Sequence, residues 1–178
     1  MMGQSQRATG LGCAMRATAP LVLRFFDGFD DSNRTIQPAG LPNHASWVLG
    51  HLALTMNRFA ERYDGLPLPA KDYLTGDGTS GNTDCYDTES VCFGSVPVDN
   101  QKIYPTVSRG IEVFQSAVDR LGGVVMGLSD DQLGEIQPWG RGEFTTEQLI
   151  ARIMFHNGTH AGQIMDLRRA LGLGRVIG

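Results

Sequence analysis

The stretch Phe155-His156-Asn157-Gly158-Thr159-His160-Ala161-Gly162-Gln163-Ile164 decides how the rest of the chain is interpreted. Residues four apart stand one above the other on a helix, so the imidazoles of His156 and His160 point to the same side. Apolar residues recur on that same face at helical spacing, and they are Leu149, Ile153, Ile164, Leu167 and Leu171. The two histidines therefore take positions where Leu or Ile would otherwise face a core.

The ends of this helix are also encoded. Thr145 and Gln148 have the spacing of a capping box, and Phe144 with Leu149 can form a hydrophobic staple. Gly172 can provide the C-terminal cap. The sequence predicts a helix that begins near Thr145 and ends near Gly172.

A second segment has the clearest periodicity in the chain. Its apolar residues keep a heptad spacing typical of a bundle helix, at Val107, Ile111, Phe114, Val118, Leu121, Val125 and Leu128. We expect this helix to begin between Asp99 and Pro105, since proline suits a first helical turn.

Two further helices are expected before it. The first has an inward face made of Leu11, Met15, Thr18, Val22, Phe25 and Phe29. Residues 1–10 read as a loose tail, and Pro20 predicts either a kink or a helix that starts near Thr18. The next helix is predicted from an N-cap at Asn43 to about Asp64, where Gly65 follows.

Two connections complete the predicted fold. Residues 65–103 have little periodicity and many turn-forming residues, so this long segment is expected to be functional or mobile, with disorder of part of it as the alternative. It is long enough to cross the bundle and let the next helix run parallel to the one before it. Residues 129–144 are expected to be a polar link. The sequence thus predicts one all-α domain over residues 1–178, a four-helix bundle.

Composition excludes several classes of function. The 178 residues carry 15 basic and 19 acidic side chains, for a net charge of −4, and the basic residues do not cluster. Nucleic-acid binding is disfavoured on that balance. No apolar run is long enough for a membrane span or a signal-peptide core, so a cytoplasmic location is expected. Cys13, Cys85 and Cys92 are expected to be free thiols, although Cys85 and Cys92 can oxidise together.

His51 joins the two histidines of the last helix as a third candidate ligand. It lies four residues after Trp47, on the predicted inward face of its helix. A lone inward histidine is more often a core residue, but three buried rings each need a polar partner or cost about 1–3 kcal/mol. One shared metal ion satisfies all three. Separate structural roles for the rings are the alternative.

Neighbouring residues are candidates for supporting this site. His44 lies two turns before His51, where it can line the mouth of the site or simply be solvated. Gln163 can reach a group bound to the metal, or it can pack against the next helix. Trp47 is a candidate pocket residue. The zinc-protease motif is disfavoured, because Asn157 stands where that motif has its catalytic Glu.

Three neutral imidazoles without a fourth protein ligand leave one coordination position open, as in catalytic rather than structural zinc sites. Imidazole also binds nickel, copper and iron, so the ligand type does not choose the metal.

Two motifs carry a resemblance to a known family. Asn43-His44-Ala45-Ser46-Trp47-Val48-Leu49-Gly50-His51-Leu52 resembles the second-helix motif of the DinB-like family, and residues 155–164 resemble its fourth-helix motif. The resemblance covers residues 14–172. It implies an up-down-down-up bundle, commonly dimeric, whose divalent metal, often zinc or nickel, would be held by His51, His156 and His160.

The resemblance also implies candidate activities, since relatives include transferases of low-molecular-weight thiols and a thiol-dependent isomerase. Our leading hypothesis is a metal-dependent enzyme that activates a small thiol, or else water in a hydrolase. The alternatives are a metal-binding protein without turnover and a plain helical dimer. Hydrolysis is the weaker choice, because Glu61 and Asp64 are expected to face solvent and no other carboxylate is expected to point inward.

Overall fold

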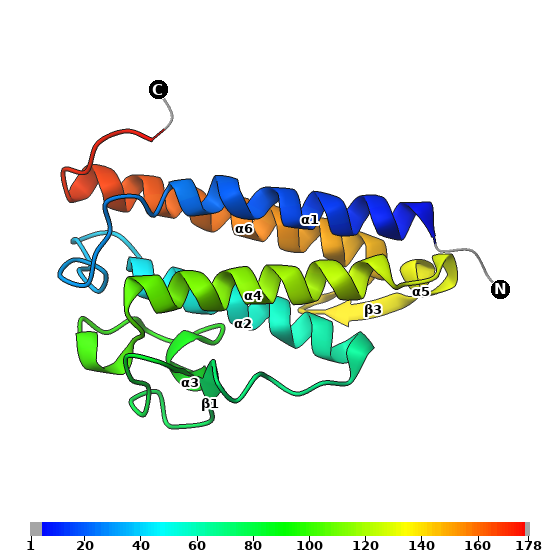
Figure 1. The fold of residues 1–178 in the computed structure, drawn as a ribbon, viewed down its shortest axis with the longest axis horizontal. Coiled ribbons are helices and arrows are strands. Elements are labelled where there is room, and N and C mark those ends of the chain that lie inside the picture. The colour runs from blue at the N-terminus through cyan, green and yellow to red at the C-terminus, as the bar shows by residue number, and fades with distance from the viewer. Residues whose placement is uncertain (1–4, 177–178) are drawn as a thin grey trace.

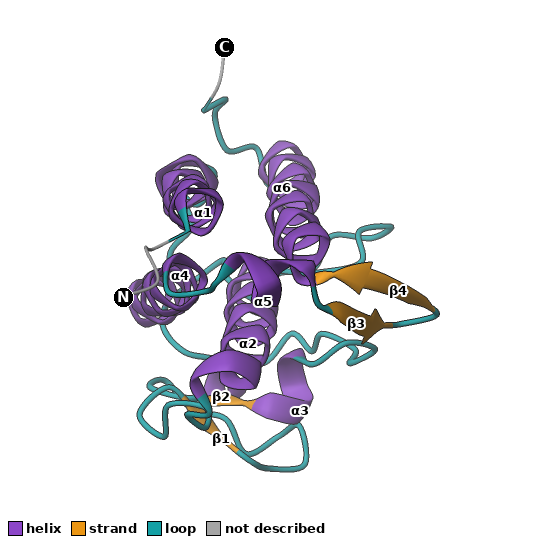
Figure 2. Ribbon diagram, turned by 90° about the vertical axis from the view of Figure 1, so that its right-hand side faces the viewer, coloured by secondary structure: helices purple, strands orange, loops and turns teal. Residues whose placement is uncertain are grey.

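Four long helices lie side by side in the computed structural model, which describes residues 5–176 (Figure 1). They are α1 (Gln6–Arg24), α2 (Ala45–Asp64), α4 (Val107–Met126) and α6 (Thr146–Ala170). Followed along the chain in Figure 1, α1 and α6 run one way and α2 and α4 run the other way. This is the predicted up-down-down-up bundle. Seen end-on in Figure 2, α1 and α2 each pack against both α4 and α6.

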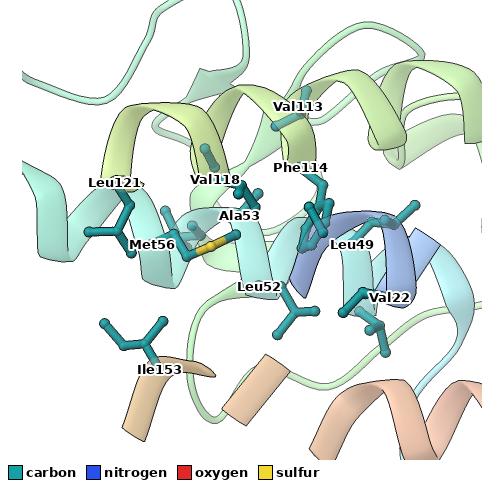
Figure 3. Close-up of a cluster of buried hydrophobic side chains, with 14 of the residues drawn as sticks. Val22, Leu49, Leu52, Ala53, Met56, Val113, Phe114, Val118, Leu121 and Ile153 are labelled. Atoms are coloured by element: carbon teal, nitrogen blue, oxygen red, sulfur yellow. The ribbon is translucent and has the colours of Figure 1, made fainter. Parts of the chain in front are cut away.

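The core lies where the inward faces of these helices meet (Figure 3). The heptad positions of α4 supply Phe114, Val118, Leu121 and Val125, all of which are buried. They pack with residues of α2 such as Met56, which is fully buried. Burying a side chain of this size contributes about 1.5–3 kcal/mol. The periodic apolar face of α4 therefore faces the core, as the sequence predicts.

The start of the first helix corrects two predictions. α1 begins at Gln6 with Ser5 as its N-cap, so residues 6–10 are helical rather than a loose tail, while residues 1–4 lie outside the described part. The helix also runs through Pro20 instead of starting near Thr18. Pro20 is exposed, so the carbonyl that loses its N–H partner can be hydrated.

The second helix is capped one residue later than predicted. His44, not Asn43, is the N-cap, and its Nδ1 accepts from the backbone N–H of Trp47 at 3.1 Å. Likewise α4 begins at Val107 with Thr106 as its cap, after Pro105 rather than before it. The predicted cap of α6 is confirmed, since Thr145 and Gln148 form a capping box.

The segment 65–103 is an ordered layer on the outside of α2. It contains β1 (Tyr73–Leu74) and β2 (Tyr86–Asp87), which pair in parallel, then α3 (Thr88–Val91) and the 3-10 helix η1 (Gln101–Ile103). The buried carboxylate of Asp87 accepts from the backbone N–H groups of Gly78, Ser80 and Glu89. The alternative of partial disorder is not what the structure has, because these polar contacts and several apolar side chains buried in the core hold the segment in place.

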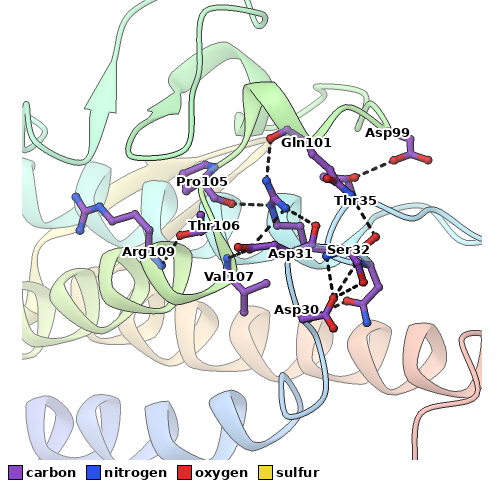
Figure 4. A network of polar contacts seen from close by, with 12 residues as sticks. Asp30, Asp31, Ser32, Thr35, Asp99, Gln101, Pro105, Thr106, Val107 and Arg109 are labelled. Carbon is purple, nitrogen blue, oxygen red and sulfur yellow. Dashed lines mark hydrogen bonds and ion pairs between the residues drawn. The ribbon is translucent and has the colours of Figure 1, made fainter.

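Buried Arg34 ties the far end of this layer to the start of α4 (Figure 4). Its guanidinium donates to the carbonyls of Pro105 at 3.0 Å and Gln101 at 2.8 Å. Beside it, Thr35 donates to Asp99 at 2.8 Å. A guanidinium with several carbonyl acceptors fixes the path of the backbone between this layer and α4.

The connection 129–144 is also more structured than the predicted polar link. It forms α5 (Asp130–Gly134) and a hairpin of β3 (Ile136–Trp139) and β4 (Gly142–Thr145). Gly140 in the hairpin turn has a φ of +62°, a conformation that glycine adopts without strain. In Figure 2 this hairpin projects beside α6, next to the site described below.

Candidate metal centre

His51 on α2 and His156 and His160 on α6 come together as predicted. The Nε2 atom of His156 lies 3.2 Å from that of His51 and 3.2 Å from that of His160. All three candidate ligand atoms lie within 4.8 Å of one another. His51 and His160 are buried and His156 is half-buried. The three nitrogens thus share one small volume between two helices.

Two of the rings are fixed through their other nitrogen. Nδ1 of His51 lies 2.9 Å from the carbonyl oxygen of Val91, and Nδ1 of His160 lies 2.8 Å from Oε1 of Gln163. Both oxygens accept, so both Nδ1 atoms carry the proton and both Nε2 atoms present a lone pair. This is how proteins orient histidines that bind metals.

These bonds leave few hydrogen atoms available between the three Nε2 atoms. If the Nε2 atoms of His51 and His160 are both acceptors, only His156 can supply a hydrogen between them. Nδ1 of His156 is buried and has no hydrogen-bond partner among the described residues. A cation that accepts all three lone pairs satisfies the arrangement better than one proton, so the residues present fit a metal ion.

The pKa shifts agree with neutral, ligand-ready rings. Burial, and then the neighbouring His160 and His51, lower the pKa of His156 to about 4. Burial lowers the pKa of His160 to about 4, with His51 adding to the effect. The pKa of His51 is also lowered by burial. All three rings are therefore neutral near pH 7, the form that binds a metal.

Trp47 supports His51 from the other side. The two rings stack with centroids 4.4 Å apart and planes 12° apart. The indole N–H of Trp47 donates to Ser95 Oγ at 2.9 Å, so the tryptophan is itself anchored to the 65–103 layer. Together with Val91, this makes the layer a part of the site. Its contribution is a backbone carbonyl and a hydroxyl, which no sequence pattern distinguishes.

Gln163 and His44 have different places. Gln163 holds His160 and in turn accepts from Asn43 Nδ2 at 2.9 Å, so it contacts a ligand ring directly. His44 is fully buried at the start of α2, against the edge of Tyr104, so the solvated position expected for it is wrong. It lies outside the three-histidine cluster and does not line the groove described next.

A groove of about 870 Å³ opens over the centre. His51 and His156 form part of its floor, and its apolar walls include Phe93, Trp139 and Phe155. None of the described residues that line it is Asp or Glu. Asp64, expected to face solvent, instead pairs with Arg120 at 2.9 Å. The groove therefore offers an apolar space beside three imidazoles, with two arginines, Arg62 and Arg152, and no carboxylate base.

A protein-family model matches most of the chain. The model of the DinB superfamily matches residues 14–164. The chain belongs to the DinB superfamily. This membership agrees with the bundle of four long helices described above.

A solved structure described as the conserved protein of locus from Enterococcus faecalis has the same fold as this DinB protein. The two are 14% identical in sequence, with a TM-score of 0.59 over 96% of this chain and 98% of the other. No curated protein matches the chain. Within residues 5–176, no helix is long and apolar enough to cross a membrane. The cysteines Cys13, Cys85 and Cys92 are free.

Proposed function

We propose that this DinB protein is a divalent-metal-dependent enzyme that activates a small thiol and transfers it to an electrophile bound in the groove. The single observation that supports this most strongly is the convergence of three imidazole Nε2 atoms beside a groove whose lining includes His51 and His156. Three imidazole ligands leave a coordination place for a substrate atom. When bound, a zinc or nickel ion would lower the pKa of a coordinated thiol so that thiolate forms near neutral pH.

The chain's own residues would supply the remaining requirements. The Val91 carbonyl and Gln163 hold His51 and His160 in the ligand tautomer. Phe93, Trp139 and Phe155 can exclude water from an electrophile that lies beside the thiol. A thiolate is already a nucleophile and needs no base to remove a proton during attack.

Hydrolysis is supported less well by the same groove. A metal-dependent hydrolase commonly places a carboxylate where it can accept a proton from the attacking water. No carboxylate lines the groove within the described residues. We therefore prefer thiol transfer, with metal binding without turnover as the competing outcome of the experiment below.

The test begins with protein purified without a polyhistidine tag. We expect about one divalent ion per chain, and conjugation of a small thiol to an electrophile such as monobromobimane above the uncatalysed rate. His156→Ala is expected to lose both the metal and the activity. Activity that survives this substitution would contradict the metal mechanism, and bound metal without turnover on thiols or esters would indicate a binding protein.

Two further properties stay predictions. The family resemblance implies a homodimer, which sedimentation velocity of the purified protein would measure. A cytoplasmic location is expected and can be tested by cell fractionation.

A further inference from the structure

The groove has a polar stripe along each of its two helical walls. On α2, Thr55 and Arg62 follow His51 by 4 and 11 residues, which places them on one face of the helix. On α6, Arg152 precedes His156 by one turn, and Thr159 follows it. Each wall thus carries an arginine in line with a ligand histidine.

Neither arginine is neutralised by the protein. Arg62 and Arg152 take no part in the ion pairs formed within residues 5–176. Both are exposed, in a chain whose net charge is −4. The positive charge of the groove is therefore local and does not reflect a basic protein.

Aromatic rings hold both guanidinium groups in place. The Arg62 guanidinium carbon lies 5.2 Å from the centre of the Trp139 ring, and that of Arg152 lies 4.3 Å from the centre of the Phe144 ring. A guanidinium over a ring face keeps its N–H edge free to donate. That edge matches a carboxylate or a phosphate with two parallel hydrogen bonds.

The helix rise gives the distance between each arginine and the centre. At 1.5 Å per residue, Arg152 stands about 6 Å along the α6 axis from His156, and Arg62 stands about 16 Å along the α2 axis from His51. A small molecule that reacts at the histidines can therefore reach Arg152 with a charged group a few bonds away. Arg62 is placed for the far end of a longer molecule.

We propose that the groove selects a small organic anion, bearing a carboxylate or a phosphate, whose charged group binds at Arg152 and, in a longer molecule, at Arg62. The statement that its other end reacts at the three histidines rests on the proposed function, whereas the anion preference does not. The anion belongs either to the thiol or to its acceptor, and the two parts of the experiment separate these sources.

The first part uses the cobalt-loaded protein, because a thiolate bound to cobalt changes its absorption spectrum. We expect 3-mercaptopropionate to bind about tenfold more tightly than its neutral amide, 3-mercaptopropionamide, if the thiol is the anion. Arg152→Gln is expected to remove this preference. The control Arg169→Gln removes the same charge outside the groove, where Arg169 pairs with Asp166, and should keep the preference.

The second part uses molecules without a thiol. Benzoate and phenyl phosphate are compared with benzamide by the quenching of tryptophan fluorescence. If the acceptor is the anion, at least one of the two anions should bind about tenfold more tightly than benzamide. Arg152→Gln should abolish the difference, and Arg169→Gln should keep it.

The proposal is overturned if neither part shows a preference for the anion, or if a preference survives the Arg62→Gln Arg152→Gln double substitution. Its failure is distinct from failure of the proposed function. If neither thiol changes the cobalt spectrum while benzoate is still preferred over benzamide, the anion site stands and thiol activation does not. If both thiols bind equally and no anion is preferred, thiol activation stands alone.

Discussion

The two walls of the candidate metal centre are built in different ways. On the α6 wall, His160 is held by Gln163, which lies three residues away on the same helix. On the α2 wall, His51 is held by the carbonyl of Val91, which lies 40 residues away in the outer layer. His156 lies between them with no partner for Nδ1 among the described residues. One candidate ligand is thus held by local helical geometry, one is held by tertiary packing, and the third is held by neither.

The largest effect is expected from the ring that has no partner. His156→Leu should lower zinc affinity by more than about 100-fold, beyond the 10- to 100-fold that loss of a supporting residue costs. In the metal-free protein the same change should not destabilise the fold, since Leu suits this face of α6. His51→Leu should remove the donor to the Val91 carbonyl, and it should therefore lower the free energy of unfolding of the metal-free protein by about 1–3 kcal/mol. Competition with a chelating dye and urea unfolding would measure the two quantities. Equal loss of metal-free stability in both variants would contradict the comparison.

The support within α6 can be removed alone. Gln163→Leu should lower zinc affinity by about 10- to 100-fold, because His160 loses the acceptor that fixes its Nδ1–H tautomer. The same chelator competition measures it. Asn43→Ala, which removes only the bond to Gln163, is the matched control and should cost less. If zinc affinity falls further in Asn43→Ala than in Gln163→Leu, Gln163 is not the direct support of His160.

The support from the outer layer depends on a close approach at Gly50. A Cβ at this position would lie 2.5 Å from the Tyr86 ring and 2.8 Å from the Val91 side chain. Gly50→Ala should therefore push the layer outward, loosen the Val91 carbonyl from His51, and lower zinc affinity by about tenfold.

Gly158→Ala is the control for that substitution. A Cβ at Gly158 on α6 meets nothing within 4 Å. This variant should bind zinc normally and be more stable by about 0.5–1 kcal/mol, as alanine is in a helix. If Gly50→Ala binds zinc normally, the outer layer does not support the histidine site, and the prediction is wrong.

The lowered pKa values predict how metal-free stability varies with pH. His156 and His160 have a pKa of about 4 in the folded protein, against an ordinary value of 6.5. Between these values the unfolded chain binds more protons, so the free energy of unfolding should fall as pH is lowered from about 6.5 to about 4. Urea unfolding at several pH values would measure this fall. It should be shallower in His156→Leu, and an unchanged slope would refute the assignment.

The smallest effect is expected at Trp47. Trp47→Phe keeps an aromatic ring against His51 but loses the hydrogen bond to Ser95 Oγ. We expect zinc affinity to change by less than about fivefold and stability to fall by about 1 kcal/mol. Trp47→Ala, which also removes the stacked ring, should have the larger effect on both. Calorimetric titration and thermal unfolding would rank the two variants.

Sequence reasoning succeeded where a helix face carries the information. The heptad of α4, the capping box at Thr145 and the inward positions of His51, His156 and His160 are all repeats at helical spacing. The N-caps Ser5 and His44 were missed, the first by several residues and the second by one, because capping there depends on which of several polar residues reaches the backbone.

The outer layer could not be predicted in the same way. Its fold depends on single contacts such as those of Arg34 and Asp87 with backbone groups, which have no period. Every residue has a backbone carbonyl, so nothing in the sequence marks that of Val91 as the partner of His51. The helical spacing of Arg152 and Arg62 to the histidines can be seen in the sequence. The sequence does not show that neither arginine forms an ion pair within residues 5–176.

The contact between His51 and His156 joins residues that are 105 positions apart. An ion held by both would close a loop of that size, as a disulfide does, but only while the fold is intact. The stability of the contact between α6 and α2 would then depend on the concentration of free metal. A protease would cut the metal-starved chain sooner, so the amount of this protein would follow the amount of its ion.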